Sequence, residues 1–176
     1  MGWYLYLKQN FRTAIFFDLD GTIINLNIND CDLENLRIKM VNLFINNNIN
    51  PHHTGIFKMY HYAQKFLDNQ FIKNLNNLIE ETEIRSIRNY KMLMNADEIK
   101  EIISMYYNVK LVGIVTNNGK NCLKKILEKN IEIANIFNVL VTREDVIEIK
   151  PSGRPIDIAV NSTCDKEEFE KVIFVG

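Results

Sequence analysis

The sequence is poor in cysteine and in net charge, and both shortages narrow what the chain can be. Its 176 residues include three cysteines, Cys31, Cys122 and Cys164, at separations that match no metal-binding or redox motif. We therefore expect reduced thiols, as in a cytoplasmic protein. A formal net charge of −1 argues against a nucleic-acid polymer as partner, because such binders normally carry a basic stripe.

Long hydrophobic runs are missing as well, so we predict no membrane partner. The apolar segment Trp3–Leu7 is too short to cross a bilayer. It also lacks the basic segment and the cleavage site that mark a signal peptide. These residues either pack against the domain or lie upstream of it, and the sequence leaves both open.

The most informative segment is residues 14–23, which read AIFFDLDGTI. The apolar run is typical of a buried strand, and Gly21 is typical of a sharp turn after it. Side chains two positions apart on an extended chain face the same side, so Asp18 and Asp20 should meet at one spot. Crowded carboxylates are costly unless a cation, a proton or a reaction uses them. This spot lies beyond a strand end, where open α/β sheets bind ligands.

Two kinds of pattern follow this segment. Apolar residues recur every three or four positions at 33–44, 56–67 and 72–79, which predicts helices with cores that include Tyr60 and Phe66. Short apolar runs at 111–115, 139–141 and 172–175 predict strands separated by helices. The fold class is therefore α/β, a Rossmann-like parallel sheet with helices on both faces and an inserted all-helical cap. We expect a core of residues 1–24 and 93–176, and a cap of residues 25–92.

Three further features lie at predicted strand ends. The segment VTNNG at 115–119 places Thr116 and Asn117 where a strand gives way to a helix, and free N–H groups at a helix start form a natural phosphate site. Lys150 begins the turn KPSGRP, which can aim its ammonium inward. The last strand ends at Gly176. By contrast, His52, His53 and His61 show no metal spacing with one another, and we expect them on the cap surface.

The order FFDLDGT, VTNNG, KPSGRP and a strand ending in VG resembles the haloacid dehalogenase superfamily of phosphohydrolases. The narrower resemblance is to its phosphoglycolate-phosphatase-like branch, which carries a helical cap after the first motif. The motifs match over residues 14–24 and 93–176, whereas the cap matches only in position and helical character.

The resemblance implies roles for individual residues. Asp18 would be the nucleophile that becomes an aspartyl phosphate, and Asp20 the general acid and base. Thr116, with the amide of Asn117 and Gly21 nearby, would bind the substrate phosphate, and Lys150 would hold nucleophile and phosphate together. Mg²⁺ would be the cofactor, with Asp18 and Asp20 as ligands. The expected partner is a small phosphorylated metabolite, and the oligomeric state stays open.

One part of the family pattern is missing. In relatives the last strand runs into a fourth motif, usually Gly-Asp, whose acid completes the magnesium site, whereas this sequence stops at Gly176. We therefore expect a fragment with weak Mg²⁺ binding, the alternative being true loss of the motif. Asp20 favours phosphoryl transfer over dehalogenation, because an alkoxide needs a proton to leave and a halide does not. A phosphomutase of the same fold and a non-catalytic phosphate-binding module remain as rivals.

Overall fold

A four-stranded parallel sheet forms the centre of the molecule, in the order β5-β4-β1-β6. The computed structural model describes residues 12–162 and 169–176, so Trp3–Leu7 and Cys164 lie outside the described residues. The sheet confirms the α/β prediction, since its members coincide closely with the predicted strands. They are β1 (Thr13–Phe17), β4 (Val109–Val115), β5 (Val139–Val141) and β6 (Lys171–Val175).

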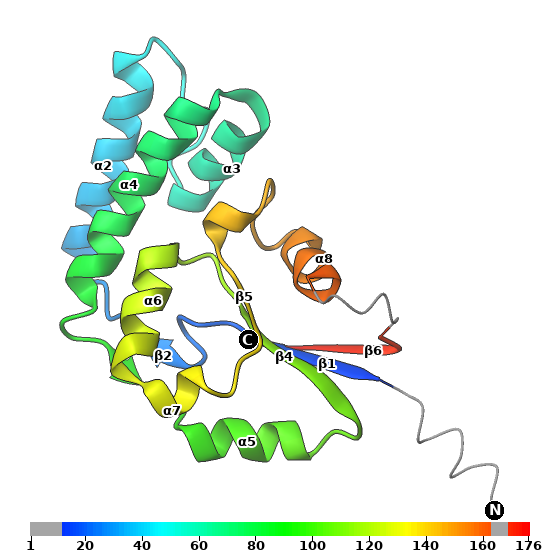
Figure 1. Cartoon of the computed structure of the whole chain (residues 1–176). Helices are drawn as coiled ribbons and strands as arrows, with labels where there is room; N and C mark the ends of the chain where they lie inside the picture. Colours follow the sequence, from blue (N-terminus) through cyan, green and yellow to red (C-terminus); the bar gives the residue numbers. More distant parts are fainter. Residues whose placement is uncertain (1–11, 163–168) are drawn as a thin grey trace, which may run out of the picture.

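Helices cover both faces of this sheet, because side chains alternate along each strand. In β1, Ile15 and Phe17 join a core with α5, α6 and α7, whereas Ala14 and Phe16 pack towards Ala159 of α8. Figure 1 shows α8 on one side of the sheet and α5 on the other. The covering helices are α5 (Ala96–Ser104), α6 (Lys120–Lys129), α7 (Ile131–Ala134) and α8 (Arg154–Asn161).

Three helices between β2 and β3 form a separate bundle, α2 (Asp30–Asn46), α3 (Ile56–Phe66) and α4 (Asn69–Ser86). Their apolar stripes meet in a second core, centred on Met40, Phe44 and Leu75, which Ile149 from the loop after β5 also joins. This outcome confirms the helices predicted from the spacing of apolar residues. In the described part of the chain, no helix combines the length and the apolar character needed to cross a membrane.

A two-stranded antiparallel sheet lies where the chain passes between the bundle and the parallel sheet. It consists of β2 (Ile24–Asn25) and β3 (Lys91–Met92). A side-chain hydrogen bond also joins the two connecting segments, since Asn27 Nδ2 donates to the carbonyl of Asn89 at 3.1 Å. Strands of two residues are too short to produce a readable alternation, and the sequence analysis missed them.

One prediction for the bundle is wrong. Tyr60 is buried as expected, but Phe66 is 63% exposed and does not belong to the bundle core. Phe66 is the last residue of α3, so the stripe that buries Tyr60 no longer faces the other helices there. Its ring instead lies 5.0 Å from the ring of Tyr62, centre to centre.

We expect the two described thiols to differ sharply in reactivity. Cys31 is free and exposed, whereas Cys122 is buried in α6. Burial raises the pKa of the Cys122 thiol far above its usual range, and the charge of Glu83 adds to the shift. Since the thiolate is the reactive form, a native Cys164→Ser variant should release one equivalent of chromophore from a disulfide reagent at pH ~8. The second equivalent should appear only after unfolding, and two rapid equivalents in the native state would contradict the buried position of Cys122.

Candidate active site

Asp18 stands directly at the end of β1. Its N–H donates to the carbonyl of Val175 at 2.9 Å, which continues the pairing of β1 with β6 by one residue. Its Oδ1 accepts a hydrogen bond from the N–H of Leu19 at 2.7 Å. The side chain is 26% exposed, so the carboxylate is fixed by its neighbours and still open to solvent.

Asp20 is held by a tight turn that reverses the chain after Leu19. The carbonyl of Leu19 accepts hydrogen bonds from three following N–H groups, and Gly21 sits at φ 86°, a conformation that favours glycine. The N–H of Gly21 donates to the carbonyl of Ile24 at 2.7 Å, so it serves the turn. Asp20 Oδ1 accepts from the N–H of Leu26 at 2.8 Å. Both acids of the motif are thus positioned by backbone hydrogen bonds.

The environment of Asp20 raises its pKa above the ordinary value for an aspartate. Surrounding protein removes part of the water from its carboxylate and is the largest cause, and the charge of Asp18 acts in the same direction. The hydrogen bonds from Leu26 and Gly21 oppose the shift. A carboxyl group that keeps its proton to higher pH is better suited to donate it to a leaving group.

Lys150 reaches the same strand end from the loop after β5. Its Nζ lies 2.7 Å from Asp18 Oδ2 and donates to the carbonyl of Val115 at 3.0 Å. The ammonium also lies 4.9 Å from the centre of the Phe174 ring. The structure therefore brings Lys150 and Asp18 together, as the turn around Lys150 predicted.

Asn117 holds the backbone on which Lys150 is mounted. Its Nδ2 donates to the carbonyl of Lys150 at 3.1 Å, and its Oδ1 accepts from the N–H of Lys150 at 3.0 Å. This two-way contact fixes the loop across the end of β4. The Asn117 side chain thus positions the ammonium without touching it.

Thr116 directly follows β4, two positions after Ile114, which pairs with Phe17 of β1, and it is buried. Its hydroxyl donates to Asn118 Oδ1 at 2.7 Å and accepts from the N–H of Asn118 at 3.1 Å. The hydroxyl therefore closes a local turn at the start of α6. Its contact with a phosphate stays a prediction, and such a contact requires the bond to Asn118 to open.

The expectation that the N–H groups at the start of α6 are free is wrong for three consecutive residues. Each donates to a carboxylate of another element, at distances of 3.0 to 3.2 Å. The pairs are Gly119 with Glu83, Lys120 with Glu144 and Asn121 with Glu80. Since the N-cap residue Gly119 has no side chain to offer, acids from α4 and from the turn after β5 complete this helix start.

The most buried charges of the described chain form an ion pair between the bundle and the sheet. Arg143 Nη1 lies 3.0 Å from Glu83 Oε1, and the two side chains are 0% and 4% exposed. Burial alone would lower the pKa of Arg143, but the charge and hydrogen bond of Glu83 outweigh it, and the pKa is raised. The guanidinium also donates to Asn76 Oδ1 at 2.8 Å and to the carbonyl of Asn117 at 2.6 Å.

Gly119 is the residue that makes room for this ion pair. A Cβ at position 119 would lie 3.0 Å from Arg143 Nη2 and 3.0 Å from Glu83 Oε2. Any larger residue would push the two side chains aside. The sequence analysis missed the pair, because Glu83 and Arg143 lie far apart in the chain and neither belongs to a recognised motif.

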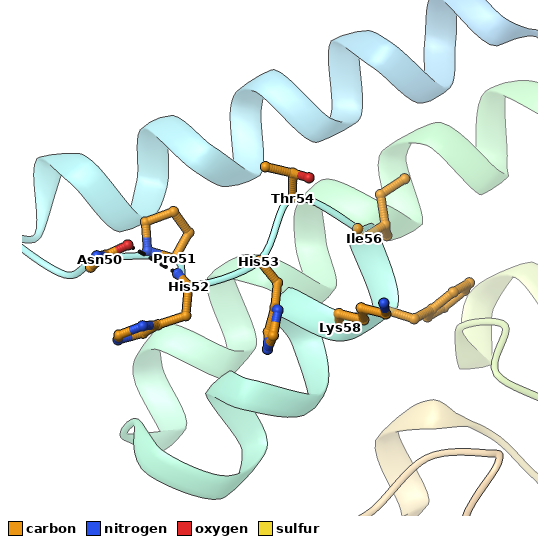
Figure 2. A pocket seen from close by; sticks show the side chains of 9 residues that line it. Asn50, Pro51, His52, His53, Thr54, Ile56 and Lys58 are labelled. Carbon is orange, nitrogen blue, oxygen red and sulfur yellow. Dashed lines mark hydrogen bonds between the residues drawn. The ribbon is translucent and has the colours of Figure 1, made fainter.

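Two hollows differ in whether a predicted site residue lines them. One of about 400 Å³ opens beside Asp20, between the turn after β1 and the bundle. Another, of about 970 Å³, lies in the loop Asn50–Lys58 and contains none of the predicted site residues. Figure 2 shows His52 and His53 on one side of this loop and Thr54 on the other. Both histidines and His61 are exposed, as predicted.

The acids at the end of β1 suit a hard cation. Mg²⁺ prefers oxygen ligands and is commonly held by one or two carboxylates together with phosphate oxygens and water. Asp18 and Asp20 provide two carboxylates at one strand end. Across residues 12–162 and 169–176 there is no group of three or more His, Cys, Asp or Glu side chains placed to hold a metal. The described donors therefore fit a shared site with a phosphate better than a closed protein cage.

Comparisons with known proteins give a family match and a curated relative. Residues 15–176 match the model of the family described as haloacid dehalogenase-like hydrolase. A curated protein named pyrophosphatase PpaX, from Bacillus cereus strain B4264, is 27% identical over 172 residues, covering 93% of this chain and 73% of that protein.

Solved structures show the same fold. A proposed phosphoglycolate phosphatase from Lactobacillus plantarum matches with a TM-score of 0.51 and 16% identity, covering 93% of this chain and 76% of the other. A haloacid dehalogenase-like hydrolase from Streptococcus pneumoniae gives a TM-score of 0.51 at 17% identity, with coverage of 93% and 75%. At such identities these likenesses concern the fold alone.

We predict that Glu83→Gln strongly destabilises the protein. The substitution leaves the Arg143 charge buried without its carboxylate, and breaking a buried pair typically costs about 3–5 kcal/mol. Urea denaturation should show this loss as a lower free energy of unfolding.

Glu81→Gln is the matched control on the same helix. Glu81 lies 3.9 Å from Lys39, and the side chains are 60% and 48% exposed. Removing such a surface pair should cost less than about 1 kcal/mol. Equal effects of the two substitutions would contradict the structural role assigned to Glu83.

Proposed function

Because this chain belongs to the haloacid dehalogenase-like hydrolase family, we propose that it hydrolyses a small phosphomonoester through an aspartyl phosphate on Asp18. The observation that carries the proposal is the 2.7 Å contact between Lys150 Nζ and Asp18 Oδ2. A carboxylate at a strand end, beside a fixed cation, is what attack on a phosphate requires. Asp20, two residues along the chain, supplies the proton chemistry.

The first step transfers the phosphoryl group to the protein. An oxygen of Asp18 attacks phosphorus, and the bond to the ester oxygen breaks. Two negative groups repel each other as they approach, and the Lys150 ammonium offsets part of that repulsion. Asp20 gives its proton to the departing alkoxide, so the products are an alcohol and an aspartyl phosphate.

The second step returns the protein to its starting state. Asp20, now ionised, takes a proton from a water molecule, and the resulting hydroxide attacks phosphorus. Inorganic phosphate leaves, and the Asp18 carboxylate is restored. A single side chain thus serves as acid and then as base, which is the reason for an aspartate at position 20.

We propose Mg²⁺ as the cofactor, with Asp18 and Asp20 as the residues that would hold it. When bound, it would supply positive charge beside the phosphate. Lys150 keeps its own role, because its ammonium is fixed by the carbonyl of Val115 as well as by Asp18. Asn117 holds the Lys150 backbone in either case.

We further propose that residues 25–92 act as a cap domain over a core of residues 1–24 and 93–176. The paired strands β2 and β3 lie at the junction, where a movement of the cap would begin. Closing a cap over the reacting atoms excludes water. The substrate would be a small phosphorylated metabolite, and the cytoplasm is the compartment we propose, since Cys31 and Cys122 are free thiols.

We expect Asp18→Asn to lower the turnover of p-nitrophenyl phosphate by about 10³-fold or more, as removal of a covalent nucleophile usually does. Initial rates with Mg²⁺ present would measure it. Asp97→Asn is the control, since the Asp97 side chain is 93% exposed on α5 and should leave the rate unchanged. Equal turnover in Asp18→Asn and the unaltered protein would exclude Asp18 as the nucleophile.

Asp20→Asn should separate the two steps. The p-nitrophenolate group leaves without a proton, so phosphorylation of Asp18 should proceed while hydrolysis of the aspartyl phosphate slows. Rapid mixing should then show a burst of product equal to the amount of protein, and mass spectrometry should show one added phosphoryl group.

Product analysis with a sugar phosphate distinguishes the rivals, since a phosphomutase returns an isomeric ester and a binding module gives no product.

A further inference from the structure

The cavity of about 400 Å³ beside Asp20 is the space that must receive the leaving group. In the proposed reaction Asp20 gives its proton to the ester oxygen, so the alcohol portion has to lie within reach of this carboxyl. Asp20 lines the cavity, and the opposite walls come from α2, α3 and α4 of the bundle. The volume is in the range of small-molecule sites.

Among the described residues, none that lines this cavity carries a positive charge. Its charged lining residues are Asp20 and Glu83, and no lysine, arginine or histidine lines it within the described residues. Glu83 is matched by Arg143, which is itself fully buried and already holds Asn76 and the Asn117 carbonyl. No cation is therefore available here for a second anionic group of a substrate.

Apolar side chains dominate the rest of the wall. Leu33 from α2, Phe57 from α3 and Ile79 from α4 all contribute to it. Leu33 and Phe57 are 37% and 48% exposed, which leaves apolar surface uncovered for a ligand to bury. The Asn118 amide adds little, since its groups already bond to Thr116 and Glu83.

A neighbouring hollow differs from this cavity because lysine side chains line it. It measures about 470 Å³ and is lined by Lys150 together with His53, Lys58 and His61. Phe57 lines both hollows, whereas Asp20 lines only the first. A negatively charged leaving group drawn to Lys58 and Lys150 would lie in the hollow that Asp20 does not line.

Resting on the proposed phosphatase function, we propose that the leaving group is an uncharged alcohol with an apolar body about the size of one ring. Leu33 and Phe57 then determine specificity by contact with that body. Esters with a carboxylate on the leaving group, and inorganic pyrophosphate, are poor substrates because they bring a second negative charge into a cavity whose described lining holds no cation to balance it. This selection differs from the activity in the name of the Bacillus cereus relative.

The test compares kcat/KM for esters whose leaving groups do or do not carry a carboxylate. Benzyl phosphate is paired with 4-carboxybenzyl phosphate, and propyl phosphate with phosphoglycolate, with pyrophosphate as a further substrate. The uncharged member of each pair should react at least about tenfold better. Equal or better turnover of the carboxylated esters or of pyrophosphate would overturn the proposal.

A pair of variants on α2 locates the effect. Leu33→Lys brings a cation to the cavity and should reduce the preference for benzyl over 4-carboxybenzyl phosphate by about tenfold. Ile38→Lys is the matched control, since Ile38 is 48% exposed on the same helix and does not line the cavity. A preference that stays the same in Leu33→Lys, or changes equally in both, contradicts the assignment.

The same assays distinguish a wrong specificity from a wrong function. Turnover of p-nitrophenyl phosphate that depends on Asp18, together with a preference for charged leaving groups, overturns the specificity alone. Absence of Asp18-dependent turnover with every ester overturns the proposed function, and the specificity with it.

Discussion

The buried ion pair between Glu83 and Arg143 is the constraint on which the rest of the arrangement depends. It joins α4 of the bundle to the end of the sheet, and the two charges must stay together because either alone would be costly to bury. Arg143 also binds the carbonyl of Asn117, whose side chain holds the backbone of Lys150. The docking of a bundle helix is thus linked, through consecutive hydrogen bonds, to the ammonium that lies against Asp18.

The same contacts decide where positive charge remains for a phosphate. The start of α6 is an electropositive helix end, but its first N–H groups are bound to Glu83, Glu144 and Glu80. Arg143 is likewise occupied by Glu83. Lys150 faces Asp18, and a phosphate dianion that arrives beside the Asp18 carboxylate brings more negative charge than one ammonium balances. The proposal of Mg²⁺ follows from that charge balance.

Sequence patterns were sufficient to predict structural features that are local or that repeat along the chain. Asn95 and Glu98 form a capping box at the start of α5, which is a local pattern, and the strand before Asp18 lies at the centre of the sheet. Lys150 could be predicted because prolines and a glycine define its turn. Phe66 was misjudged because periodicity places a residue on a helix face but does not say where the neighbouring helix stops.

The contacts that the sequence could not predict are the ones that shape what the site accepts. Nothing in the sequence distinguishes Glu83 from the other acidic residues on the helices. Only the fold brings it to Arg143 and Gly119. Its pairing with Arg143 leaves no cation among the described residues that line the cavity beside Asp20, while Lys58 and Lys150 line the hollow beyond Phe57. The motif residues are positioned by backbone turns of the core, so they can be shared among proteins with different substrates. In the proposed function, selection among those substrates would depend on long-range contacts with the bundle, which no local pattern encodes.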